Sequence, residues 1–119
     1  MQIITTILVV LVTLLHCYFL VLEMFLWTKP KGLKTFRMTK EHADITAPLA
    51  ANQGLYNGFL AAGLVWSLMV KDPVYSKQIS LFFLACVVVA GIYGAFTVNR
   101  RIFFIQALPA ILAIIFLFI

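Results

Sequence analysis

Two ionisable side chains, His16 and Glu23, interrupt the first apolar stretch of the chain. They are seven residues apart, so on a helix they lie on nearly the same face, about 10 Å apart along the axis. A carboxyl group and an imidazole in apolar surroundings are suited to proton exchange or general acid–base chemistry. The alternatives are structural: Glu23 extends its carboxylate to a nearby polar interface, and His16 hydrogen-bonds within the core.

A second apolar stretch carries four polar side chains, Asn52, Gln53, Tyr56 and Asn57. Amides in apolar surroundings are costly unless they are hydrogen-bonded, and the Gly and Ala residues within 50–63 let neighbouring helices approach. We therefore expect this segment to face protein. Its donors and acceptors then serve either a ligand or the packing of helix against helix.

The composition predicts a membrane protein. Of the 119 residues, 64% are hydrophobic and 11% are charged, whereas about a quarter of a soluble domain is charged. A soluble fold of this length could not hide so much apolar surface. The net charge of +5 does not indicate nucleic acid as a partner, because Lys and Arg lie in short segments between apolar runs. The Cys and His spacing matches no zinc site, so no metal is expected, and no motif points to a cofactor.

Four apolar runs are long enough to cross a bilayer, which takes about 20 helical residues. They cover approximately residues 3–27, 48–70, 79–98 and 102–119. Short connections make consecutive helices antiparallel. We therefore predict an all-α integral membrane protein, an up-down bundle of four transmembrane helices in a single domain over 1–119. Pro48 either begins the second span or kinks a helix that runs through it.

The basic residues predict the orientation. Seven of them lie in the first and third connections and two in the second: Lys29, Lys31, Lys34, Arg37, Lys40, Arg100 and Arg101, against Lys71 and Lys77. The positive-inside rule then places the first and third connections in the cytoplasm and both termini outside. At about 1.5 Å per residue, Glu23, the amides, Tyr93 and Gln106 share one layer in the cytoplasmic half, with His16 deeper.

Four segments resemble one family over nearly the whole chain. They are LEMFLW (22–27), AANQGLYNGFLAAG (50–63), AGIYGAFTVNRR (90–101) and QALPA (106–110). They are similar to the small bacterial membrane proteins of domain-of-unknown-function family 1304. The resemblance implies a four-helix protein of the bacterial inner membrane, and it implies no activity.

Three functions stay open. In the first, a polar pocket in the cytoplasmic half binds a small or lipophilic molecule, as in a proton-coupled small-molecule transporter, and a homodimer encloses it. In the second, Glu23 and His16 act as acid and base of a membrane-embedded enzyme on a lipid or isoprenoid. In the third, the protein is structural and has no ligand. The candidate residues are Glu23, His16, Asn52, Gln53, Tyr56, Asn57, Tyr93 and Gln106.

Overall fold

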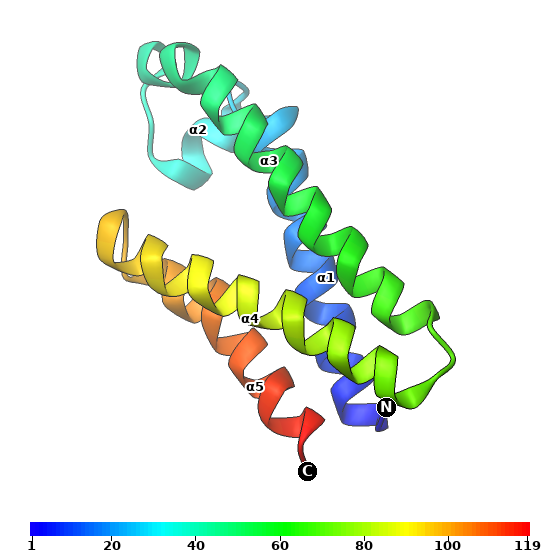
Figure 1. Ribbon diagram of the computed structural model, residues 1–119. Coiled ribbons are helices and arrows are strands. Elements are labelled where there is room, and N and C mark those ends of the chain that lie inside the picture. Colours follow the sequence, from blue (N-terminus) through cyan, green and yellow to red (C-terminus); the bar gives the residue numbers. More distant parts are fainter. The chain divides into compact units, whose positions relative to one another are not determined.

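The chain is all-α. A computed structural model describes residues 1–119, and they contain six helical segments and no strand (Figure 1). The segments are α1 (Ile3–Met24), α2 (Pro30–Phe36), α3 (Lys40–Met69), α4 (Pro73–Thr97), the π-helix η1 (Phe103–Ala107) and α5 (Leu108–Leu117). The predicted all-α class is confirmed.

The chain divides into two compact units. The larger unit comprises residues 1–15 and 60–119, and the smaller unit comprises residues 16–59. Helices α1 and α3 each contribute residues to both units. The single domain over 1–119 stays a prediction.

The core of the larger unit is aliphatic and draws on four helices. Its fully buried residues come from α1, α3, α4 and α5: Val9, Val12, Leu64, Leu84, Val87, Ala110 and Ala113. Burying side chains of this kind contributes about 1.5–3 kcal/mol for each large residue. Ala110 and Ala113 are three residues apart on one face of α5, which lets that helix lie close to its neighbours.

Small residues set the closest helix contacts of the larger unit. A Cβ on Gly91 would lie 2.7 Å from the backbone nitrogen of Ala107, and one on Gly63 would lie 2.3 Å from the ring of Phe83. Gly94 faces Ile102. From the small residues of the sequence alone, we expect Gly54, Gly58 and Ala62 of the second predicted span to pack against Gly91 and Gly94 of the third. That pairing is wrong, since Gly91 and Gly94 pack against the segment that follows α4 rather than against α3.

The turn after α4 leads into a wider helical segment. Leu108 N–H donates to the carbonyl of Phe103, five residues earlier, instead of four as in an α-helix. Pro109 follows in the first turn of α5, where no backbone N–H is needed. The last predicted span therefore consists of two helical segments, and Gln106 lies in the π-helix.

The smaller unit contains a helix inside the predicted loop of 28–47. α2 begins at Pro30, which suits a first helical position, and Gly32 packs against the carbonyl oxygen of Leu26. Trp27 holds this segment, because its indole N–H donates to Thr46 Oγ1 at 3.0 Å and its ring lies 4.7 Å from that of Phe36.

α3 begins earlier than the predicted second span. Thr39 Oγ1 accepts the N–H of His42 at 3.1 Å, which caps the helix at its start. Pro48 then lies inside α3. Of the two alternatives for Pro48, the helix that runs through it is the one observed.

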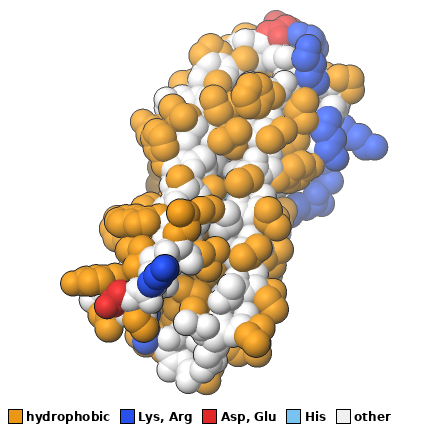
Figure 2. Space-filling view, turned by 90° about the vertical axis from the view of Figure 1, so that its right-hand side faces the viewer, with side chains coloured by type: hydrophobic (Ala, Val, Ile, Leu, Met, Phe, Trp, Pro, Cys, Tyr) orange, Lys and Arg blue, Asp and Glu red, His pale blue; other side chains and the backbone are white.

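Two helices, α1 and α4, are long and apolar enough to cross a membrane. Residues 103–117 form a shorter apolar helical stretch. The amides of residues 52–57 fall within α3, the part of the chain predicted as the second span. Hydrophobic side chains are spread over the face seen in Figure 2, with backbone and other side chains between them. The chain is thus suited to association with a membrane, and the four-span bundle stays a prediction.

Candidate functional site

A buried carboxylate bonded to two amides forms the candidate site. Glu23, in the last turn of α1, is 4% exposed. Asn57 Nδ2 donates to Glu23 Oε1 at 2.5 Å, and Gln53 Nε2 donates to Glu23 Oε2 at 2.5 Å. Both amides project from the same face of α3 because they are four residues apart. All three side chains belong to the smaller unit.

Two glycines let α3 approach α1 closely enough for these bonds. A Cβ on Gly54 would lie 2.7 Å from Met24 Cγ and 3.1 Å from Glu23 Cβ. A Cβ on Gly58 would lie 2.7 Å from Leu20 Cδ1. Each glycine directly follows one of the amide residues in the sequence, so the small stripe and the donor stripe run side by side along α3.

The other polar residues of this segment turn away from the carboxylate. Asn52 is exposed, and Tyr56 is 57% exposed, with its ring edge against Phe59 at 5.8 Å. Asn52 and Tyr56 are also four residues apart, so they share a different face of α3 from that of Gln53 and Asn57. The predicted set of four therefore divides into two pairs, and one pair binds Glu23.

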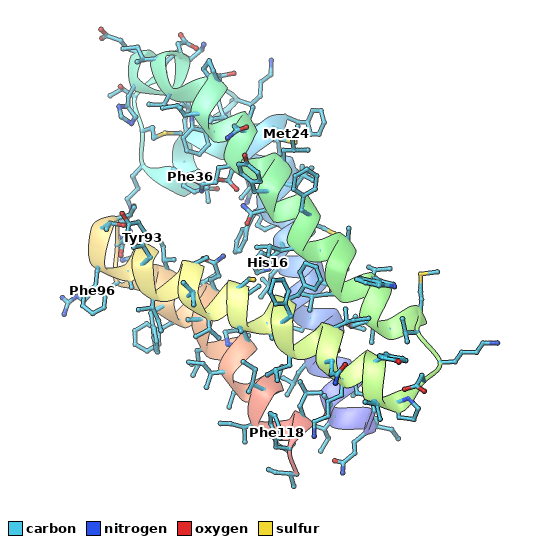
Figure 3. The ribbon with its side chains drawn as sticks, in the orientation of Figure 1. His16, Met24, Phe36, Tyr93, Phe96 and Phe118 are labelled. Atoms are coloured by element: carbon cyan, nitrogen blue, oxygen red, sulfur yellow. The ribbon has the colours of Figure 1, made fainter.

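His16 lies two turns before Glu23 on α1 and does not reach it. It is fully buried, and its ring meets Phe19 edge-on at 5.3 Å. Figure 3 shows His16 and Met24 along α1. Seven residues of helix separate His16 from Glu23, about 10 Å along the axis, which is too far for a direct hydrogen bond.

Tyr93 and Gln106 belong to the larger unit. Tyr93 is 70% exposed near the end of α4, and Gln106 is half-buried in the π-helix. Their participation in the Glu23 site stays a prediction.

The Glu23 cluster has donors but no cation. The salt bridge of the smaller unit joins Lys40 to Asp44 at 2.6 Å, on the exposed first turns of α3. The two neutral amides leave the negative charge of an ionised Glu23 uncompensated, and a buried charge of this kind is costly. No group of three or more His, Cys, Asp or Glu side chains that could hold a metal ion is formed. Chemically, the cluster can exchange a proton or accept a cationic group.

These features define an all-α protein with two helices suited to a membrane and a buried carboxylate–amide cluster. The chain belongs to the family described as "Protein of unknown function (DUF1304)", which matches residues 10–118. It is 32% identical over 117 residues to "Uncharacterized protein YpaA" of Lactococcus lactis subsp. lactis, covering 97% of each chain. No solved structure matches. The predicted family is confirmed.

Proposed function

We propose that this protein lies in the bacterial inner membrane as four spans and binds a small, lipophilic cation at Glu23, exchanging it for a proton during transport. The observation that carries the proposal is the buried Glu23 carboxylate, held by Gln53 and Asn57 with no cationic partner. An intramembrane carboxylate of this kind marks an ion or substrate pathway more often than a packing contact.

The amides fix the direction of the Glu23 carboxylate. Both use N–H groups to hold the carboxylate, so the carboxylate stays directed toward α3 rather than outward to a polar interface. Gln53 is itself exposed, whereas Asn57 is 8% exposed. Access to Glu23 therefore runs past Gln53, and rotation of that one side chain frees an oxygen for a ligand. Because four helices enclose little volume, we include a homodimer in the proposal, with a second copy covering this face.

Binding of tetraphenylphosphonium, a lipophilic cation, tests the exchange. We expect the purified protein in detergent to bind it more tightly at pH 8 than at pH 6, because protons compete for the same carboxylate. Glu23→Gln keeps the shape and removes the charge, so binding should weaken at least about tenfold at pH 8 and lose its dependence on pH. Isothermal titration calorimetry measures both quantities.

Glu41→Gln is the matched control, since Glu41 is exposed in the first turn of α3 and the change in net charge is identical. It should bind as the wild type does. Equal affinity of wild type and Glu23→Gln at both pH values would refute the proposal. Uptake of ethidium into vesicles driven by a proton gradient then separates transport from binding alone.

A structural function is the second candidate, and one observation favours it. Both oxygens of Glu23 already accept amide hydrogen bonds, which joins α1 to α3 without any ligand. In that case Glu23→Gln lowers stability and changes no cation binding. Catalysis has less support, because about 10 Å of helix separates His16 from Glu23 and prevents the two from acting on one bond directly.

A further inference from the structure

An apolar groove with one cationic side chain lies at the end of α4. It is lined by Ile92, Ala95, Phe96, Arg100, Phe103 and Phe104, all in the larger unit, and its volume is about 590 Å³. Ligand pockets typically enclose about 300–1,000 Å³. Phe96 is 88% exposed and extends outward from the last turns of α4 (Figure 3). The groove is therefore a large apolar surface beside a charge.

Arg100 has no acidic partner within the larger unit. The one acidic residue of the larger unit is Asp72, and its carboxylate caps the opposite end of α4. With 25 residues, α4 separates the two by about 37 Å. The side chain of the neighbouring Asn99 does not bind the guanidinium group of Arg100, because its Oδ1 accepts the backbone N–H of Arg101. An exposed guanidinium group beside a groove of this kind is free to pair with an anion from outside the chain, and its fork of N–H donors matches phosphate.

The position of the groove selects the type of anion. The residues just before Thr97 and just after Arg101 are apolar, and the short stretch 97–101 holds four polar residues. In a membrane this stretch lies at the boundary between hydrocarbon and headgroups, with the aromatic side chains of the groove on the hydrocarbon side. The occupant that fits is an anion joined to an acyl chain.

We propose that this groove binds one anionic phospholipid, with the phosphate at Arg100 and an acyl chain along Phe96, Phe103 and Phe104. Guanidinium and phosphate form paired, charge-assisted hydrogen bonds. The acyl chain fills the apolar lining, which a soluble phosphate cannot do. The site depends on the proposed membrane placement and not on Glu23.

Native mass spectrometry of the delipidated, full-length protein in detergent tests the site with dioleoyl phosphatidylglycerol, dioleoyl phosphatidylcholine and glycerol 3-phosphate. We expect one phosphatidylglycerol per chain, bound at least tenfold more tightly than phosphatidylcholine. Arg100→Gln should remove this preference. Ala95→Phe should weaken both lipids, because the added ring fills the groove without changing charge. Millimolar glycerol 3-phosphate should not displace the lipid.

Arg37→Gln is the control for charge, since Arg37 is an exposed arginine of the smaller unit. It should keep the preference. Equal binding of the two lipids by the wild type would overturn the proposal, as would an equal loss in Arg37→Gln and Arg100→Gln. Displacement by glycerol 3-phosphate would instead make the ligand a soluble phosphate and overturn the lipid. If Ala95→Phe binds both lipids unchanged, the acyl chain does not lie in this groove. Tetraphenylphosphonium binding by Arg100→Gln should match that of the wild type, which keeps this test separate from that of Glu23.

Discussion

Glu23 accepts hydrogen bonds at both carboxylate oxygens, and its two neighbours respond differently when it changes. Asn57 is buried and has few alternatives to Glu23, whereas Gln53 is exposed and can turn to other partners. A buried amide left without a partner costs about 1–3 kcal/mol. The stability of the cluster therefore depends on whether residue 23 still offers an acceptor to Asn57.

We expect Glu23→Leu to lower the thermal unfolding midpoint in mild detergent by about 3–10 °C, because Asn57 loses its acceptor. Glu23→Gln should lose less than half as much, since its amide oxygen still accepts one bond and the side chain of Asn57 can rotate to match. Circular dichroism at 222 nm follows the transition. If the two variants have the same unfolding midpoint, the hydrogen bond that glutamine can still accept from Asn57 contributes nothing to stability.

The members of this cluster were partly predictable from the sequence. Polarity within apolar runs identified Glu23, Gln53 and Asn57, and depth along the helices placed them at one level. The same reasoning could not exclude Asn52 and Tyr56, because consecutive residues of a helix point about 100° apart and polarity does not say which face meets a neighbour. The stripe of Gly54 and Gly58 was the available signal, since it marks the face of α3 that approaches another helix.

At the scale of helices, local capping chemistry explains where the structure departs from the sequence prediction. Pro30 starts α2 within the connection between the first two predicted spans, and Thr39 caps α3, which begins eight residues before the predicted start of the second span. A cap and a first-turn proline are favourable wherever the chain allows them, so α2 forms, and α3 begins, within the connection between the first two predicted spans. A span predicted from hydropathy includes only the apolar part of α3. The helix therefore begins before the predicted span.

The glycines of α4 allow a matched test of helix packing. We expect Gly91→Ala to destabilise the protein by about 1–3 kcal/mol, because the new methyl group would lie 2.7 Å from the backbone nitrogen of Ala107, which cannot move by rotating a side chain. Gly94→Ala should cost less, since its methyl group would lie 3.0 Å from the side chain of Ile102.

Thermal unfolding of the two variants in the same detergent gives the comparison. Similar midpoints for Gly91→Ala and wild type would mean that α4 and the segment of 103–107 are further apart in solution than the structure places them. A larger loss in Gly94→Ala than in Gly91→Ala would point to Ile102 as the tighter contact.

At the scale of the whole molecule, the sequence predicts the fold class and the family better than the number of membrane spans. The all-α class and the family followed from apolar runs and sequence segments, and both are confirmed. Hydropathy alone does not predict the number of spans, because the amides of the candidate site make α3 less apolar than α1 and α4. A polar face directed at another helix can be tolerated in a bilayer, and hydropathy counts it as if it faced lipid.

The orientation of the chain gives the prediction that tests the membrane topology directly. Seven of the nine basic residues lie in the first and third connections, so these connections should stay in the cytoplasm and the second connection should lie outside. Cys17→Ser and Cys86→Ser first remove both native thiols, of which Cys17 is exposed. Lys34→Cys in this background should react with a membrane-impermeant maleimide only after intact bacterial cells are broken, whereas Lys71→Cys should react in intact cells.

If both positions are labelled in intact cells, residues 34 and 71 lie on the same side of the membrane. The chain would then not cross the membrane once between them, and the predicted second span would be wrong. If position 34 is labelled in intact cells and position 71 is not, the orientation is the opposite of the predicted one. The Glu23 cluster and the Arg100 groove would then belong to the outer half of the membrane.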